Sequence, residues 1–269
     1  MIEMSKARIR EIEMAYDVEG SGPTVVLLHG FPFNRTMWRE QTEALSDRYR
    51  VITPDLRGFG ETSANSSEPA TMREMAEDVA ALMDRLDIER FTLGGLSMGG
   101  YVAFAFYRHF PLRVRNLILA DTRPQSDTDE ARENRERQAQ QALSEGMEGI
   151  AEAMLPKLLA PATLSERKDV VERLRAMMTG TSPQGAAAAL RGMAERPDQA
   201  HLLPRILAPT LIIVGSEDQI TPVKDAQIMH REIRGSHLEV IEGAGHVSNL
   251  ERPSEFNRAL RAFLDSLQP

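Results

Sequence analysis

Short apolar runs alternate along most of this chain with segments whose apolar residues repeat at the period of a helix. The runs have the length of buried strands and lie at residues 24–28, 49–53, 91–93, 114–120, 210–214 and 238–241, after a weakly alternating stretch at 8–18. Helical periods occupy residues 38–47, 72–86, 98–109, 223–234 and 251–267. Strands that alternate with helices predict an α/β fold with a mainly parallel, doubly wound sheet.

The interval between residues 123 and 204 breaks this alternation. It contains no strand-like run, and its amphipathic pieces are rich in methionine and separated by prolines. We interpret it as a helical cap of residues 123–204, inserted into a core formed by residues 1–122 and 205–269. The charged stretch at residues 127–140 is interpreted as the solvated face of a helix.

Composition narrows the class of protein. A chain of 269 residues suits one large domain with an insertion. The net charge of −8, with basic and acidic residues interspersed, argues against nucleic acid as a partner. The absence of cysteine excludes disulfides, thiolate zinc sites and a cysteine nucleophile. Because no apolar run resembles a signal peptide or could cross a bilayer, we expect a cytoplasmic protein without a membrane span.

A Gly-x-Ser-x-Gly pentapeptide, GLSMG at residues 95–99, stands between an apolar run and a helical segment. A strand that turns sharply into a helix can hold a serine at the tip of the turn only where its neighbours are small, because larger side chains would collide with the strand and the helix. Gly95, Gly99 and Gly100 meet this condition. The pattern therefore marks Ser97 as the candidate nucleophile.

A serine hydroxyl is a weak nucleophile near neutral pH, and it needs a base together with a group that orients the base. His246 is the best candidate base because it follows the last predicted strand in a loop of small residues. Asp218 is the best candidate for the orienting carboxylate because it lies just beyond the strand at 210–214, where parallel sheets collect functional groups. Asp121, at the end of the preceding strand, and Glu217 remain alternatives.

A serine that attacks a carbonyl carbon also needs hydrogen-bond donors for the oxyanion that forms. The backbone N–H of Met98 is one candidate, because it directly follows the nucleophile at the start of a helix, where the first amides are unpaired. The loop after the strand at 24–28 offers the second. In that loop Phe31 is the candidate donor, since Gly30 allows the turn and Pro32 has no N–H.

With these motifs the chain resembles α/β-hydrolase-fold esterases of the compact, cap-bearing group. The resemblance rests on HGFP at 29–32, DLRGFG at 55–60, GLSMGG at 95–100, GSED at 215–218 and GH at 245–246. It implies a mostly parallel sheet of about eight strands with a helical cap after the sixth, and a triad in the chain order Ser97, Asp218, His246. It also implies an oxyanion hole formed by the N–H groups of Phe31 and Met98. Serine at position 97 argues against the related dehalogenases, whose nucleophile is an aspartate.

The function that this resemblance implies is hydrolysis of carboxylic esters through an acyl-enzyme on Ser97, without a metal or an organic cofactor. The region around Ser97 and the end of the strand at 114–120 are also similar to 3-oxoadipate enol-lactonases, so the alternative substrate is a lactone whose carboxylates Arg123 would hold. Val247 is a further candidate for binding the substrate. Trp38 is another, and its alternative role is to pack the first helix. Other proteins that resemble this fold are small-molecule receptors, which is the alternative outside enzymes. Either a monomer or a homo-oligomer is compatible with the sequence.

Overall fold

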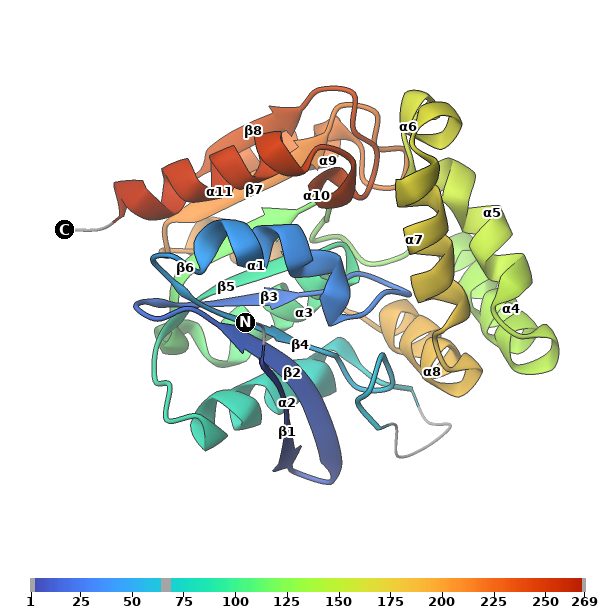
Figure 1. Cartoon of the computed structure of the whole chain (residues 1–269), viewed down its shortest axis with the longest axis horizontal. Coiled ribbons are helices and arrows are strands. Elements are labelled where there is room, and N and C mark those ends of the chain that lie inside the picture. Colours follow the sequence, from blue (N-terminus) through green and yellow to red (C-terminus); the bar gives the residue numbers. More distant parts are fainter. Residues whose placement is uncertain (1–2, 64–68, 268–269) are drawn as a thin grey trace.

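The computed structural model describes residues 3–63 and 69–267, and its centre is a single twisted sheet (Figure 1). Within the described residues the sheet has eight strands in the order β1-β2-β4-β3-β5-β6-β7-β8. Only β2 runs against the others: it pairs antiparallel with both β1 and β4, and the remaining neighbours in the sheet pair parallel. The strands are β1 (Glu3–Ile9), β2 (Ile12–Glu19), β3 (Thr24–Leu28), β4 (Arg50–Pro54), β5 (Phe91–Leu96), β6 (Val114–Ala120), β7 (Thr210–Gly215) and β8 (His237–Ile241). The predicted mostly parallel sheet is confirmed.

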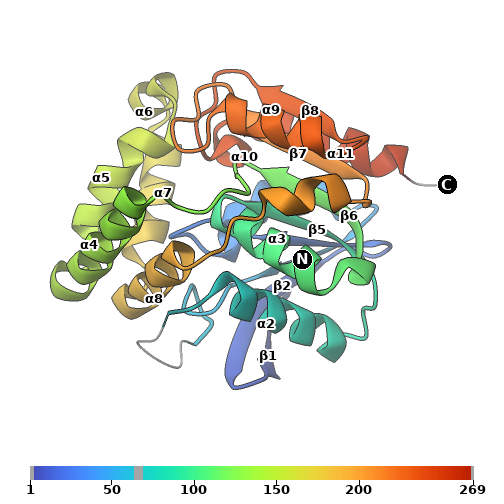
Figure 2. The ribbon, with the colours of Figure 1, turned by 180° about the vertical axis from the view of Figure 1, so that it is seen from behind.

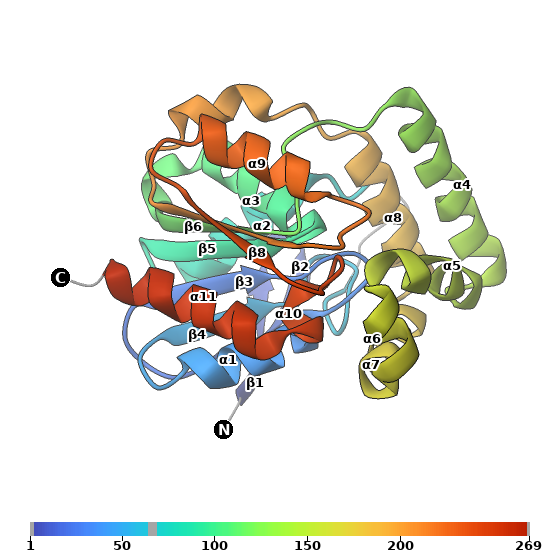
Figure 3. The same ribbon diagram turned by 90° about the horizontal axis from the view of Figure 1, so that it is seen from above.

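Helices cover both faces of the sheet, as the view in Figure 3 shows. One face carries α2 (Met72–Arg85), α3 (Met98–His109) and α9 (Val223–Glu232), and the other carries α1 (Arg39–Leu45) and α11 (Pro253–Ser266). Because strands between two helical layers have no solvated face, β5 and β7 are buried along their whole length. The short elements are η1 (Arg35–Trp38), η2 (Pro111–Arg113), η3 (Ala200–Arg205) and α10 (Ser248–Glu251).

Five helices lie between β6 and β7 in the sequence and form a layer at one end of the sheet (Figures 1 and 2). They are α4 (Asp129–Glu145), α5 (Glu148–Leu158), α6 (Pro161–Glu166), α7 (Lys168–Thr179) and α8 (Pro183–Ala194), called the cap helices below. In α4 the buried residues are Ala139 and Ala142, while α8 buries Ala186 through Ala189. Alanines on both helices let their backbones lie close together. No helix among the described residues is long and apolar enough to cross a membrane.

The first two strands form a hairpin, although apolar and polar residues alternate only weakly in this part of the sequence. Ile9 pairs with Ile12, so the turn consists of Arg10 and Glu11, and Arg10 adopts a φ of +48°. A left-handed turn residue is usually glycine, asparagine or aspartate, so an arginine there gives no turn signal in the sequence. The sequence pattern over residues 8–18 therefore does not by itself predict a hairpin.

Candidate active site

Ser97 lies on the tight turn that joins β5 to α3. Its backbone has a φ of +54°, which L-residues adopt only at a cost in energy. Small neighbours permit the turn: a Cβ on Gly95 would lie 2.2 Å from the carbonyl oxygen of Gly99, and one on Gly99 would lie 2.2 Å from that of Leu28. The fold therefore holds Ser97 at the carboxyl end of a central strand with its hydroxyl outside the sheet.

His246 and Asp218 come from the loops after β8 and β7, and both reach the same end of the sheet. His246 Nε2 lies 2.8 Å from Ser97 Oγ, and His246 Nδ1 lies 2.8 Å from Asp218 Oδ2. The second oxygen of Asp218 accepts the backbone N–H groups of Ile220 and Thr221 at 2.8 and 2.9 Å. The structure thus brings the three predicted residues into one continuous chain of hydrogen bonds, and all of it except Ser97 is deeply buried.

The negative charge of Asp218 and the positive charge of protonated His246 stabilise each other. Burial disfavours the imidazolium form of His246, but the negative charge of Asp218 and its hydrogen bond outweigh burial, so the pKa of His246 lies above its ordinary value of 6.5. Burial likewise disfavours the ionised form of Asp218, yet the charge of His246 and the hydrogen bonds lower the pKa of Asp218. An imidazole in this setting can accept a proton from Ser97 and be stabilised as a cation.

Asp121, the sequence-based alternative to Asp218, lies nearby but makes other contacts. Its carboxylate accepts the N–H of Gly215 at 2.9 Å and the hydroxyl of Ser248. Among the described residues it is Asp218, and not Asp121, that hydrogen-bonds to His246. Complete burial and the charge of Asp218 raise the pKa of Asp121 well above its usual value. The backbone N–H of Glu217 donates to the carbonyl of Ala244, and no hydrogen bond joins the Glu217 side chain to His246 among the described residues.

The two predicted oxyanion donors flank Ser97. Phe31 lines the same cavity as Ser97, and Met98 follows Ser97 as the first residue of α3. Neither backbone N–H donates to another described residue. The preceding loop is fixed by His29, which is fully buried: its Nδ1–H donates to Gly30 and its Nε2 accepts the N–H of Leu56, both at 2.9 Å. Because both ring nitrogens bond to the backbone, we interpret His29 as a structural residue that holds this loop.

A cavity of about 70 Å³ opens beside the serine hydroxyl, between core and cap. Its wall includes a cation that the sequence analysis missed, Arg135 of α4, in the charged stretch interpreted as a solvated face. That interpretation is wrong for Arg135 and for Asp127, which is buried and ion-paired with it. The lining residues are Phe31, Ser97, Tyr101, Arg135, Met154, Leu158, Met193, Ile220 and His246.

The three residues predicted to bind substrate are not in this lining set of described residues. Trp38 is 1 % exposed and packs against Phe256, because η1 turns it toward α11. Val247 is fully buried. Arg123 reaches instead toward Asp127, 3.6 Å away, and lines a different cavity. The three side chains thus lie outside the residues that line the cavity next to Ser97, and their assignment to substrate binding stays a prediction.

The cap is joined to the loop of His246 by buried hydrogen bonds. The N–H of His246 donates to Leu158 of α5 at 2.7 Å. Glu251, 1 % exposed, accepts the N–H of Gly245 at 2.7 Å through one oxygen and the N–H of Ala160 at 2.9 Å through the other. One carboxylate thereby links the loop of the base to the junction between α5 and α6. The described residues include no cluster of three or more histidines, aspartates or glutamates arranged to hold a metal ion.

The sequence model of the alpha/beta hydrolase fold matches residues 23–253. The chain belongs to the α/β-hydrolase family. The chain is 33 % identical over 242 residues to 3-oxoadipate enol-lactonase 2 of Acinetobacter baylyi, covering 90 % of this chain and 88 % of that one. A thermophilic esterase from Thermogutta terrifontis with malate bound is 44 % identical, with a TM-score of 0.96 over 99 % of this chain and all of that one.

A third relative is the enol-lactonase of Burkholderia xenovorans, which is 28 % identical, with a TM-score of 0.91 over 97 % of this chain and 100 % of that one. This α/β hydrolase is thus similar both to esterases and to enol-lactonases along almost its whole length. The predicted resemblance to the esterase and lactonase group is confirmed.

Proposed function

We propose that this α/β hydrolase cleaves carboxylic esters through an acyl-enzyme formed on Ser97. The observation that carries the proposal is the unbroken path of hydrogen bonds from Asp218 through His246 to the Ser97 hydroxyl. A nucleophile, a base within 2.8 Å of it and an acid that orients the base are what acyl transfer requires. The similarity to an esterase from Thermogutta terrifontis supports the same reaction class.

The proposed reaction follows from these positions. His246 Nε2 takes the proton of Ser97 Oγ while Oγ bonds to the carbonyl carbon of the ester. The resulting oxyanion accepts the N–H groups of Phe31 and Met98, and Asp218 stabilises the imidazolium. As the bond from carbon to the leaving oxygen breaks, Nε2–H protonates the alcohol. Water, deprotonated by the same nitrogen, then attacks the acyl-enzyme and releases the acid and Ser97.

A covalent phosphonate probe tests this proposal directly. Incubation with a nitrophenyl alkylphosphonate should release one nitrophenolate per chain and abolish ester hydrolysis, because the phosphonyl group mimics the tetrahedral intermediate. Peptide mass spectrometry should place the adduct on Ser97. Ester hydrolysis that persists in fully labelled protein, or an adduct on another residue, would contradict the assignment.

Arg135 favours a substrate that carries a carboxylate. Its side chain lines the cavity with Ser97, and its only ion-pair partner among the described residues is the buried Asp127. The related Thermogutta terrifontis esterase has malate, a dicarboxylate, bound. Two of the relatives above are enol-lactonases. We therefore propose, as the second candidate, hydrolysis of lactones or esters with an acidic group near the scissile bond.

Replacement of Arg135 separates the two candidates. A hydrogen bond between charged groups contributes about 1.5–3 kcal/mol, so Arg135→Ala should lower kcat/KM for carboxylate-bearing lactones and esters by roughly 10- to 150-fold. Hydrolysis of neutral acetate esters should change little. The matched control is Arg137→Ala on the same helix, whose side chain is 64 % exposed. Equal losses on acidic and neutral substrates would remove the support for an acidic substrate.

A further inference from the structure

One buried hydroxyl beside Asp218 and His246 takes no part in the proposed reaction. It belongs to Thr221, which is 1 % exposed and lies three residues after Asp218. Thr221 Oγ1 lies 2.7 Å from Asp218 Oδ2 and 3.3 Å from His246 Nδ1. The three polar atoms therefore form a closed triangle, whose third side is the 2.8 Å hydrogen bond between His246 and Asp218.

The chemistry of the three groups fixes the direction of these hydrogen bonds. An ionised carboxylate can only accept, and a hydroxyl has one proton to donate. The Thr221 hydroxyl therefore donates to Asp218 Oδ2 and turns its lone pairs toward the Nδ1–H of His246. Although burial raises the pKa of Asp218, the charge of His246 and the hydrogen bonds from His246 and Thr221 together lower it.

Thr221 holds both oxygens of this carboxylate. Its backbone N–H donates to Asp218 Oδ1 at 2.9 Å, while its hydroxyl donates to Oδ2. Asp218 accepts four hydrogen bonds among the described residues, and the other two come from the N–H of Ile220 and from His246. One residue thus supplies half of the bonds that fix the plane of the carboxylate. Without the hydroxyl, the imidazole that Oδ2 has to orient would be the one described group that holds Oδ2.

The local backbone leaves the Thr221 hydroxyl to this site. A threonine just before a helix often caps the first turn through its side chain. Here the N-cap of α9 is Pro222, and no side chain caps the helix. The Thr221 hydroxyl contacts Asp218 and His246 instead. Because a proline follows, helical backbone angles are disfavoured at Thr221, which limits the positions open to its side chain.

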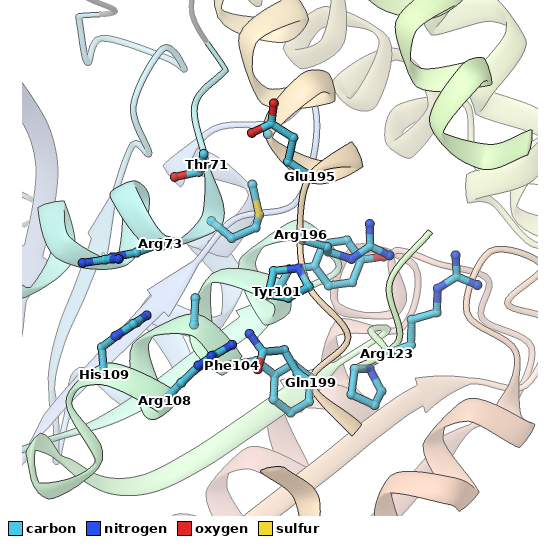
Figure 4. Close-up of a pocket in the computed structure, with 15 residues that line it drawn as sticks. Thr71, Arg73, Tyr101, Phe104, Arg108, His109, Arg123, Glu195, Arg196 and Gln199 are labelled. Atoms are coloured by element: carbon cyan, nitrogen blue, oxygen red, sulfur yellow. The ribbon is translucent and has the colours of Figure 1, made fainter. Parts of the chain in front are cut away.

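We propose that Thr221 is a positioning residue that fixes the Asp218 carboxylate against the imidazole of His246. The inference rests on the proposed function, in which Asp218 orients His246 while His246 takes the proton of Ser97. Thr221 lines neither the cavity beside Ser97 nor the second cavity, of about 300 Å³, that Figure 4 shows around Tyr101. Its hydroxyl should therefore affect the rate of proton transfer and leave substrate binding unchanged.

Steady-state kinetics with nitrophenyl acetate test this role. Thr221→Val keeps the branched shape and removes the hydroxyl, so kcat should fall at least about tenfold, because a hydrogen bond to a charged group is lost. Acylation and deacylation both use His246 and should slow together, so KM should stay within about twofold. Thr221→Ser keeps the hydroxyl and should retain kcat within about threefold. Thr221→Ala gives the same comparison as Thr221→Val if the valine variant does not fold.

The matched control is Thr210→Val at the start of β7. Thr210 is also 1 % exposed, but its hydroxyl donates to the backbone carbonyl of Ala208 at 2.8 Å. Thermal unfolding of each variant measures the loss of stability that follows from removing a buried hydroxyl. Thr210→Val should keep wild-type kcat even where it loses as much stability as Thr221→Val.

A second readout needs no ester hydrolysis. The Nδ1–H proton of His246 is buried and hydrogen-bonded to a carboxylate, so it should give a proton NMR signal downfield of the backbone amides. In Thr221→Val this signal should broaden or vanish, because a carboxylate that turns more freely exposes the proton to exchange with water more often. Thr221→Ser and Thr210→Val should keep the signal sharp.

The proposal is overturned if Thr221→Val keeps wild-type kcat or a sharp Nδ1–H signal, if Thr221→Ser loses as much kcat as Thr221→Val, or if Thr210→Val does. A change confined to KM would place Thr221 in substrate binding and overturn it as well. A wild-type chain that hydrolyses no ester would contradict the proposed function alone, and the NMR signals would then decide the role of Thr221.

Discussion

The Ser97→Ala variant is expected to hydrolyse nitrophenyl acetate at least about 10⁴-fold more slowly than the wild-type chain. The physical reason is that no other described side chain combines a hydroxyl with His246 Nε2 at 2.8 Å and a position at the mouth of the cavity. The residual rate would come from the oxyanion donors and from substrate positioning alone. Steady-state kinetics with an acetate ester measure the loss in kcat.

The control for this variant is Ser165→Ala, which changes an exposed serine of α6 whose hydroxyl donates to backbone carbonyls. It should retain wild-type kcat. Both variants should unfold at nearly the same temperature as the wild type, because the Ser97 side chain contributes only one hydrogen bond and its strained backbone is kept by alanine. Wild-type turnover by Ser97→Ala would remove the nucleophile from the proposal altogether.

The second large effect is expected from Asp218→Asn, with a loss of about 10⁴-fold in kcat. An amide at this position has no charge to stabilise the imidazolium, and its NH₂ group can force His246 into the wrong tautomer. Asp121→Asn is a closely matched control, because Asp121 is also a buried strand-end carboxylate but contacts Gly215 and Ser248 instead of the imidazole. We expect this control to lose less than about tenfold. The reverse ranking would assign the orienting role to Asp121.

The Asp218→Asn variant should also change the pH dependence of kcat/KM in a defined direction. Catalysis needs neutral His246, so kcat/KM falls as the pH falls through the pKa of His246 in the free enzyme. Because that pKa is raised above 6.5, the acidic limb of the wild type should lie above pH 6.5. Asp218→Asn removes the charge that raises this pKa, so the limb of its residual activity should move to lower pH. A limb that stays in place would show that another group titrates.

The positions of Ser97, Asp218 and His246 could be predicted because each depends on local sequence at the end of a strand. The glycines around Ser97 permit one backbone geometry, and the strand order of a parallel sheet then brings the three loops to one edge. The predicted chemical roles of these residues remain predictions until the variants are measured. The sheet itself followed from apolar runs, whose burial on both sides leaves a clear signal.

The substrate-contacting residues could not be predicted in the same way, because they depend on how the cap helices close over the core. Arg135 lies in a helix that consists mostly of charged and polar residues and buries few of them, which is typical of a solvated surface. Its inward orientation is set by Asp127, eight residues earlier, and by the packing of α4 against α8. For Trp38 the sequence left open whether the side chain lines the pocket or packs the first helix, and in the structure it fills the core beside Phe256.

The buried carboxylate of Glu251 has a consequence for how the substrate range of this hydrolase can be changed. Because it holds the N–H of Ala160 in the cap and the N–H of Gly245 beside the base, a replacement cap has to supply a backbone N–H at the same place. A foreign cap that lacked an N–H at this point would leave half of the carboxylate unpaired and loosen the loop that carries His246. Single substitutions on the inner surface of the existing cap, at residues such as Met154 and Met193, should therefore change the substrate range with less disturbance of His246 than replacement of the whole cap.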